Sequence, residues 1–353
     1  MELNNIIFSF LLSFVGFFFN KYLILSIKKS KFNLLSDDQF KKPQAFHTNP
    51  TFILGGITFF SLLILVFFYL FYYKNIFLIE YISFCSFFFF LGLIDDLKIN
   101  IRPKFRLLIM GALLVGLVIS NEIYIEKTGL KFLNDLLEID VFSIFFICLC
   151  FLFIINGSNL IDGFNGLLSI HALIIFIFLF AINFIADHQN LMYVLFYFII
   201  LTLIFIIFNF PKAQIFLGDS GAYLLGSLIS ISIIKTSILN PTISPFFFCI
   251  LLFYLFFEVF FSFFRKLFFA KQSPLMPDDK HLHMYLYKSL LKKKFTKEKS
   301  NYSVSIYINS IFLLLMIPAI FFMKNGIFCK YYFFFLIFIY AYFYKMLYKK
   351  IKY

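Results

Sequence analysis

The sequence contains no tryptophan, and only 14% of its 353 residues are charged. A soluble domain is about one quarter charged, so the shortage of charge argues against a soluble globular protein. The five cysteines form no C-x-x-C pair and nearly all lie in apolar runs, which favours buried small hydrophobic side chains over functional cysteines. The missing tryptophan, beside 61 phenylalanines, is typical of an AT-rich genome, and we attach no function to it.

Long apolar runs take up most of the chain, which is 62% hydrophobic with a mean hydropathy of +0.93. About 20 residues at roughly 1.5 Å each span the hydrocarbon layer, so runs of this length predict membrane helices. The fold class is therefore predicted to be all-α: a polytopic integral membrane protein that forms a single transmembrane domain over residues 1–353. About eleven transmembrane helices are expected, near 4–26, 52–73, 77–95, 105–121, 141–157, 166–186, 190–209, 220–239, 246–264, 304–323 and 327–347.

The basic residues are divided unequally between the loops. With eleven spans, one side of the membrane carries 24 Lys and Arg residues and the other carries six. Basic loops stay in the cytoplasm, which places the N-terminus outside and the polar stretch 265–303 in a cytoplasmic loop, with a short amphipathic helix around 286–296. This clustering follows from membrane topology, so the formal charge of +13 does not indicate nucleic acid. The six residues on the outer side are Lys74, Lys127, Lys131, Lys235, Lys324 and Lys330.

Four polar stretches border the apolar runs on the predicted cytoplasmic side. They are "LGLIDDLKIN", "NGSNLIDGFNG", "IFLGDSGAYLLG" and "SPLMPDDKHLHMYL". Taken singly, each has a structural explanation, because acids at helix ends are often solvated among lipid head groups, and Asn, Gly, Asp and Ser commonly cap helices. Four such stretches at one membrane depth favour a functional site instead, since ionisable groups at the membrane edge are functional by default.

These stretches are rich in carboxylate and amide side chains. A cation would relieve the repulsion between the acids, and aspartate oxygens suit Mg²⁺, a hard ion that shares its site with substrate phosphates. The basic neighbours Lys98, Arg102, Lys104 and Arg106 suit phosphate recognition, and the "GDSG" turn can present N–H donors to an anion. The pattern therefore predicts a magnesium diphosphate bound at the membrane surface.

The same stretches, in the same order, resemble the motifs of the polyprenyl-phosphate N-acetylhexosamine-1-phosphate transferases, the MraY and WecA-like enzymes. "HTNPTFILGG" (47–56) resembles H-x-x-P-T-P-R-x-G-G, and "GLIDDLKINIRPKFRLL" (92–108) resembles G-x-x-D-D followed by P-K-x-R-L-L. "NGSNLIDGFNGL" (156–167) resembles N-A-x-N-x-x-D-G-x-D-G-L, and "FLGDSGAYLLG" (216–226) resembles F-x-G-D-S-G-S-x-x-L-G. "FEVFFSFFRK" with "SPLMPDDKHLHMYL" resembles D-T-x-x-V-x-x-R-R and S-P-x-x-P-D-x-x-H-L-H-H, and "HLHM" favours the WecA-like branch.

The resemblance implies that a UDP-N-acetylhexosamine gives its sugar 1-phosphate to polyprenyl (undecaprenyl) phosphate, with UMP released and Mg²⁺, or Mn²⁺, as cofactor. It implies a multi-pass protein of the bacterial inner membrane whose site faces the cytoplasm and whose product begins a cell-envelope glycan, such as O-antigen, lipopolysaccharide or peptidoglycan. The expected partners are the UDP-sugar, the lipid and the membrane, without nucleic acid; a homodimer is left open. The implied catalytic residues are Asp95, Asp96, Asp162, His281 and His283; the implied substrate-binding residues are Asn159, Asn165, Lys104, Arg106 and His47; and the implied metal ligands are Asp219 and Asp96.

Three motifs depart from the family pattern. Phe52 and Ile53 replace a proline and an arginine of the first motif, Asn165 replaces the second aspartate of D-G-x-D-G, and Met284 replaces the last histidine. These changes leave a catalytically weak or inactive homologue, which binds polyprenyl phosphate or partner enzymes, as the alternative function. An ion-coupled transporter is a third hypothesis, but transporter acids lie near the bilayer midplane, and here only Glu258 lies inside a predicted span.

Overall fold

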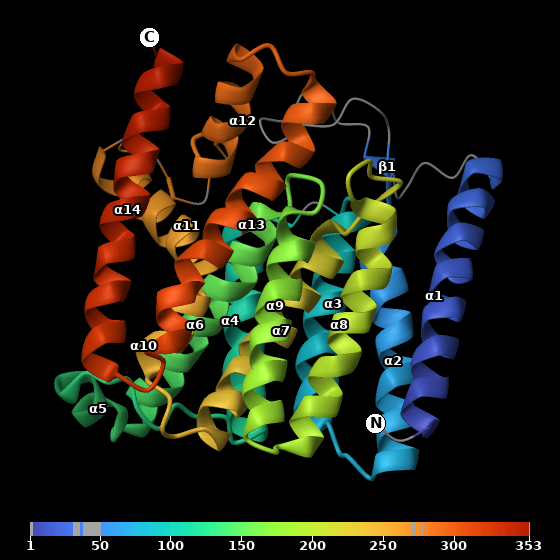
Figure 1. Cartoon of the computed structure of the whole chain (residues 1–353), viewed down its shortest axis with the longest axis horizontal. Helices are drawn as coiled ribbons and strands as arrows, with labels where there is room; N and C mark the ends of the chain where they lie inside the picture. The colour runs from blue at the N-terminus through green and yellow to red at the C-terminus, as the bar shows by residue number, and fades with distance from the viewer. Residues whose placement is uncertain are drawn as a thin grey trace.

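The computed structural model describes residues 3–30, 36–37, 51–99, 101–269, 271, 273–274, 276 and 278–352. Within these ranges the chain is mostly helical and has only short strands, which confirms the predicted all-α fold class (Figure 1). The helices are α1 (Leu3–Ser30), α2 (Gly55–Lys74), α3 (Ile79–Asp96), α4 (Pro103–Ser120), α5 (Lys131–Leu137), α6 (Asp140–Ile161), α7 (Leu167–Ile185), α8 (Gln189–Asn209), α9 (Gly218–Leu239), α10 (Pro245–Leu251), α11 (Phe253–Phe264), the π-helix η1 (Arg265–Phe269), α12 (Leu282–Lys292), α13 (Lys297–Phe321) and α14 (Gly326–Lys352).

The predicted apolar segments coincide with helices, apart from 246–264, which is divided. There α10 meets the helix that follows it at an angle of 75°. This segment contains neither proline nor glycine, so the bend has no local signal in the sequence. Nine of the described helices are long and apolar enough to cross a membrane, and ten if the bent pair forms one span.

α3 lies outside that group, and its 18 residues carry three acids, Glu80, Asp95 and Asp96. The chain is a multi-pass membrane protein, while the count of eleven spans and the external N-terminus stay predictions. Figure 1 shows the two termini at opposite ends of the bundle, which is the arrangement that an odd number of crossings produces.

α9 runs through the middle of the bundle and packs against α2, α3, α6 and α7 (Figure 1). Small side chains let helix backbones approach closely inside a membrane. Gly92 of α3 lies so close to α9 that an added Cβ would be 2.5 Å from the carbonyl oxygen of Asp219. α9 therefore fixes where the neighbouring helix ends lie. Its small buried residues are Ser220, Gly221, Ala222, Gly226, Ser227, Ser230 and Ser232.

A three-stranded sheet ties the first motif to the start of α9. Ile53 lies opposite Phe216 in a parallel pair, and the N–H of Gly56 donates to the carbonyl of Leu217 at 2.9 Å. The sequence does not predict this sheet, because strands of two or three residues are too short to show a period. The strands, in sheet order, are β1 (Ser36–Asp37), β2 (Thr51–Ile53) and β3 (Ile215–Phe216).

The stretch 265–303, predicted to be a loop with one short helix, contains more helix than expected. η1, α12 and the first turns of α13 lie within it, because α13 begins at Lys297 rather than near residue 304. α12 is the predicted amphipathic helix, and it packs against α13 and α14. The ring of Tyr285 lies 5.2 Å from that of Tyr344 and 5.8 Å from that of Tyr348. The H-x-H segment is therefore held against the C-terminal helices.

Candidate active site

Asp96, at the end of α3, caps the first turn of α9. Its Oδ1 accepts a hydrogen bond from the N–H of Asp219 (2.8 Å), and its Oδ2 accepts from the N–H (3.0 Å) and the hydroxyl (2.5 Å) of Ser220. α9 has no side-chain cap of its own, because Leu217 stands at its N-cap position. The carboxylate from α3 satisfies the first free N–H groups instead, where the helix dipole also favours negative charge. Asp96 thus holds the backbone of Asp219 in place.

Gly218 is required at the first position of α9. Its φ of +77° lies in the left-handed region that favours glycine, and an added Cβ would lie 2.7 Å from Oδ2 of Asp96. The same Cβ would collide with the side chain of Ile53. Ile53, which stands where the family motif has arginine, therefore lies beside the start of α9.

Asp219 lies where four helices meet. Its Oδ1 accepts a hydrogen bond from the side-chain amide of Asn159 in α6 (2.6 Å), and its Oδ2 lies 3.9 Å from Nη1 of Arg106 in α4. The same Arg106 nitrogen donates to Oδ2 of Asp95 in α3 at 3.0 Å. The Asp219 side chain is 37% exposed, against 10% for Asp95, so Asp219 is more open to a ligand than Asp95. The structure thus brings together four of the residues predicted from separate stretches.

Asp162 follows α6 directly and adds a further carboxylate. Burial raises its pKa well above the usual value, and the negative charges of Asp219 and Asp96 raise it further. The acids therefore repel one another, and a cation beside them would relieve the repulsion. In the described ranges, no three Asp, Glu, His or Cys side chains form a ready-made metal cage. Mg²⁺ still fits this donor set, because it binds through one or two carboxylates and completes its shell with waters and substrate phosphates.

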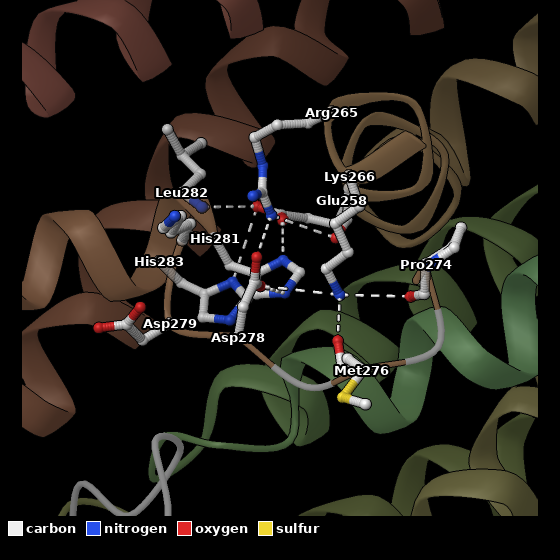
Figure 2. A network of polar contacts seen from close by, with 12 residues as sticks. Glu258, Arg265, Lys266, Pro274, Met276, Asp278, Asp279, His281, Leu282 and His283 are labelled. Carbon is white, nitrogen blue, oxygen red and sulfur yellow. Dashed lines mark hydrogen bonds and ion pairs between the residues drawn. The ribbon is translucent and has the colours of Figure 1, made fainter. Parts of the chain in front are cut away.

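A second polar cluster surrounds His281, which is 2% exposed (Figure 2). Its Nδ1 lies 3.1 Å from Oε2 of Glu258, and its Nε2 lies 3.2 Å from Oδ1 of Asp278. Asp278 also pairs with Arg265 (2.7 Å) and approaches Lys266 (3.8 Å). Both ring nitrogens of His281 therefore face protein carboxylates, and the side chain joins α11 to the segment before α12. Its predicted contact with a substrate phosphate stays a prediction.

His283, in the first turn of α12, is fully buried and also approaches Glu258. Its Nδ1 lies 3.1 Å from the hydroxyl of Tyr254 and 3.6 Å from Oε1 of Glu258. Its Nε2 is buried and has no hydrogen-bond partner among the described residues. The ring of Phe164 packs edge-on against the imidazole at 5.7 Å. Because Phe164 follows Asp162 by two residues, a single turn after α6 borders both the histidines and the carboxylates.

The pKa values of His281 and Asp278 move apart in this cluster. Burial disfavours the charged imidazole, but the hydrogen bonds and charges of Asp278 and Glu258 outweigh burial and raise the pKa of His281 above 6.5. For Asp278, burial is likewise outweighed by its hydrogen bonds with His281 and Arg265, which hold its pKa below 3.8. Asp278 and His281 are therefore both charged at pH values between 3.8 and 6.5.

The stability that this pair provides should depend on pH. The interactions that raise the pKa of His281 stabilise the fold fully below its unfolded pKa of 6.5. This stabilisation is lost as pH rises through the pKa of His281 in the folded protein. The interactions that lower the pKa of Asp278 stabilise the fold above its unfolded pKa of 3.8. This stabilisation is lost as pH falls through the pKa of Asp278 in the folded protein. We expect His281→Asn to destabilise the protein by about 1–3 kcal/mol more at about pH 6 than at about pH 9. Thermal unfolding of both proteins in detergent measures this, and an equal gap at both pH values would contradict the charged pair.

The remaining predicted substrate-binding residues are Lys104, Asn165 and His47. Lys104 is exposed in the first turn of α4. Asn165 joins separate segments: its side-chain amide donates to the carbonyl of Pro211, and its N–H donates to Oδ1 of Asn301, both at 2.9 Å. A carboxylate cannot donate the first of these bonds, which explains an asparagine where the family motif has aspartate. His47 lies outside the described residues, so its role stays a prediction.

Tyr223 is a residue that the sequence motifs do not single out. It is fully buried in α9, and its hydroxyl has no hydrogen-bond partner among the described residues. It follows Asp219 by four residues, so the two share a face of α9, and helical side chains lean toward the helix N-terminus. The hydroxyl accordingly interacts electrostatically with Asp219 and Arg106. The four-residue spacing from "GD" is the signal in the sequence that points to it.

The sequence is similar to a protein family and to known transferases. Residues 78–237 match the family described as "Glycosyl transferase family 4". The chain is 30% identical over 202 residues to the undecaprenyl-phosphate alpha-N-acetylglucosaminyl 1-phosphate transferase of Thermotoga maritima, a match covering 55% of this chain and 57% of the relative. It is 33% identical over 201 residues to the phospho-N-acetylmuramoyl-pentapeptide-transferase of Dictyoglomus thermophilum, covering 54% and 61%.

A third relative is the probable undecaprenyl-phosphate N-acetylglucosaminyl 1-phosphate transferase of Bacillus subtilis, 29% identical over 198 residues, with 55% of this chain and 53% of the relative covered. The chain spans less than two thirds of the length of each of these relatives. The family match, 78–237, contains Asp95, Asp96, Asp162 and Asp219, whereas the cluster around His281 and His283 lies beyond it.

Proposed function

We propose that this chain, which matches glycosyl transferase family 4 over residues 78–237, is a polyprenyl-phosphate N-acetylhexosamine-1-phosphate transferase. It transfers an N-acetylhexosamine 1-phosphate from a UDP-sugar to polyprenyl phosphate and releases UMP. The observation that carries the proposal is the convergence of Asp95, Arg106, Asn159 and Asp219 from four helices at one end of the bundle. A lipid acceptor explains why the site lies at the end of membrane helices. In this proposal that end faces the cytoplasm of a bacterial cell.

In the proposed reaction, a phosphate oxygen of the lipid attacks the phosphorus that bears the sugar, the phosphoanhydride bond breaks, and UMP leaves. Phosphoryl transfer depends mainly on positioning and on neutralising charge. Arg106, between Asp95 and Asp219, is placed to contact the phosphates. Asp95 bonds Arg106 through Oδ2, and its Oδ1 would accept the proton of the lipid phosphate or orient it. Nε2 of His283 would steady the diphosphate.

Asp219, with Asp162 near it, would hold Mg²⁺ or Mn²⁺, which neutralises the charge of the donor diphosphate when bound. Asn159 orients the carboxylate of Asp219, and Asp96 fixes its backbone. Because both oxygens of Asp96 already accept hydrogen bonds from α9, we assign Asp96 a positioning role in place of the predicted direct metal contact.

A UMP-release assay tests the proposed function. Purified protein is incubated with polyprenyl phosphate, Mg²⁺ and a panel of UDP-sugars that includes GlcNAc, GalNAc and deoxy derivatives. We expect UMP only when the lipid and an accepted UDP-sugar are both present. The resemblance to the WecA-like branch favours UDP-sugars that carry no peptide. If folded protein releases no UMP with any sugar, the result would support the alternative that the chain is an inactive homologue. The departures from the family motifs at Ile53, Asn165 and Met284 are the basis of that alternative.

Tyr223→Phe should slow the reaction without unfolding the protein. A hydrogen bond to a charged group contributes about 1.5–3 kcal/mol, so losing the hydroxyl should reduce kcat/KM by roughly 10- to 100-fold if it donates to a substrate phosphate. Tyr197→Phe is the matched control, because Tyr197 is another fully buried tyrosine, in α8, whose hydroxyl interacts with Tyr69 and Ser9 rather than with the candidate site. Equal kcat/KM for the two variants would remove Tyr223 from the site.

A further inference from the structure

A hollow of about 780 Å³ is lined by residues between α9 and α10 and at the start of α14. Figure 1 shows these segments at the end of the bundle that carries α5. The hollow contains Lys127, Lys324 and Lys330, and no described carboxylate lines it. None of these lysines forms an ion pair with a described acid. Lys127 donates one hydrogen bond to the carbonyl of Pro241, and Lys330 lies 5.6 Å from the ring of Tyr331, so the positive charges have no carboxylate partner among the described residues. The walls of the hollow come from segments that are far apart in the sequence, at 127–129, 242–246 and 324–330.

Positive charge is concentrated in this hollow. Of the six basic residues that the sequence assigns to this side of the membrane, three gather here. Two of the others are engaged elsewhere, because Lys235 pairs with Glu80 at 2.9 Å and Lys74 lies over the ring of Tyr193 at 4.7 Å. The three ammonium groups repel one another without an acid between them, and a bound anion would relieve that repulsion.

The wall of the hollow also offers hydrogen-bond donors. The side chain of Ser244 is 6% exposed, and apart from the adjacent thiol of Cys329 its hydroxyl has no hydrogen-bond partner among the described residues. A thiol is only a weak hydrogen-bonding group, so this buried hydroxyl is poorly satisfied. α14 begins at Gly326 in the same wall, and the start of a helix attracts negative charge. Both features suit a ligand that carries acceptor oxygens.

An apolar cavity of about 510 Å³ joins the hollow. The two share Lys127, Pro245 and Phe246. Beyond these residues the cavity is lined mainly by aromatic and aliphatic side chains such as Phe333, while Glu126 lines the cavity rather than the hollow. A small soluble anion would leave this cavity unfilled, whereas a molecule with a phosphate and a hydrocarbon chain would occupy both spaces.

We propose that the hollow binds the phosphate head group of an anionic glycerophospholipid, with one acyl chain in the adjoining apolar cavity. The three lysines contact the phosphate oxygens, and Ser244 donates to them. Because the lipid binds the folded chain, it stabilises the protein by mass action. The site lies at the opposite end of the bundle from Asp219, so it does not depend on the proposed transferase activity.

Native mass spectrometry of the full chain in detergent, titrated with phosphatidylglycerol, tests the proposal. Each lysine near a membrane surface contributes about a fivefold factor in affinity, so a Lys324→Gln, Lys330→Gln double variant should bind phosphatidylglycerol roughly 30-fold more weakly than the wild type. Lys131→Gln is the matched control, because Lys131 is exposed in α5 at the same end and outside the hollow. It should bind the lipid as the wild type does.

Two comparisons identify the ligand. Phosphatidylcholine should bind more weakly than phosphatidylglycerol, and inorganic phosphate alone should not raise the unfolding temperature of the wild type. Equal affinity of the double variant and Lys131→Gln for phosphatidylglycerol would overturn the proposal. So would equal binding of the two phospholipids, which would leave the lysines without a role, or full stabilisation by inorganic phosphate, which would assign the hollow to a free anion.

Discussion

Asp219→Asn should reduce UMP release by roughly 100- to 1,000-fold, the loss typical of removing one group that stabilises transition-state charge. Asparagine keeps the oxygen that accepts from Asn159, removes the negative charge, and places an NH2 group where Oδ2 lies 3.9 Å from Arg106. The variant should therefore fold normally, with an unchanged unfolding temperature, and lose activity because it no longer holds the cation. Initial rates under saturating UDP-sugar and lipid measure the effect.

Asp135→Asn is the matched control for this substitution. Asp135 is exposed in α5, at the end of the bundle opposite Asp219. Its replacement removes the same charge from the same membrane protein without touching the candidate site, so its rate should equal that of the wild type. A wild-type rate for Asp219→Asn would remove Asp219 from the proposed metal site.

Gly92→Ala should reduce both the stability and the activity of the protein. A Cβ at residue 92 would lie 2.5 Å from the carbonyl carbon and oxygen of Asp219 and from Cα of Ser220. These are backbone atoms of α9 and cannot rotate away, so α3 and α9 must separate. A misplacement of about 1 Å at a reacting centre costs roughly 100-fold in rate, and overpacking costs about 1–3 kcal/mol of stability. We therefore expect both a lower unfolding temperature and at least this loss of UMP release.

Gly116→Ala tests whether any helical glycine would give the same result. Gly116 lies in α4, and an added Cβ there would meet nothing within 4 Å. Alanine is favoured over glycine in a helix interior by about 1 kcal/mol, so this variant should be as active as the wild type and slightly more stable. Similar activity for Gly92→Ala and Gly116→Ala would show that α3 and α9 are not packed as closely as described.

The sequence predicts the meeting of Asp95, Arg106, Asn159 and Asp219 for a simple physical reason. Each residue borders an apolar run on the same side of the membrane, and helices in a bundle must bring such ends together. The role of Asp96 does not follow from this pattern. Asp96 caps α9 because Leu217 cannot accept a hydrogen bond at the N-cap, and that arrangement depends on how closely α3 packs against α9.

The histidine motif shows a similar limit. The spacing of His281 and His283 predicts two imidazoles on one segment, but both are buried beside Glu258, which lies 23 residues before His281 in another helix. The sequence around the bend between α10 and α11, residues 246–264, contains no proline or glycine that would predict it. Both features arise from tertiary packing, which a local pattern cannot report.

Binding of Mn²⁺ followed by electron paramagnetic resonance tests the central claim most directly, namely that Asp219 holds a divalent cation beside the donor diphosphate. The wild type and Asp135→Asn should bind Mn²⁺ more tightly once UDP-GlcNAc or another accepted donor is added, because the diphosphate completes the coordination shell. Asp219→Asn should lose this donor-dependent binding. Equal donor-dependent Mn²⁺ binding by Asp219→Asn and the wild type would contradict the account.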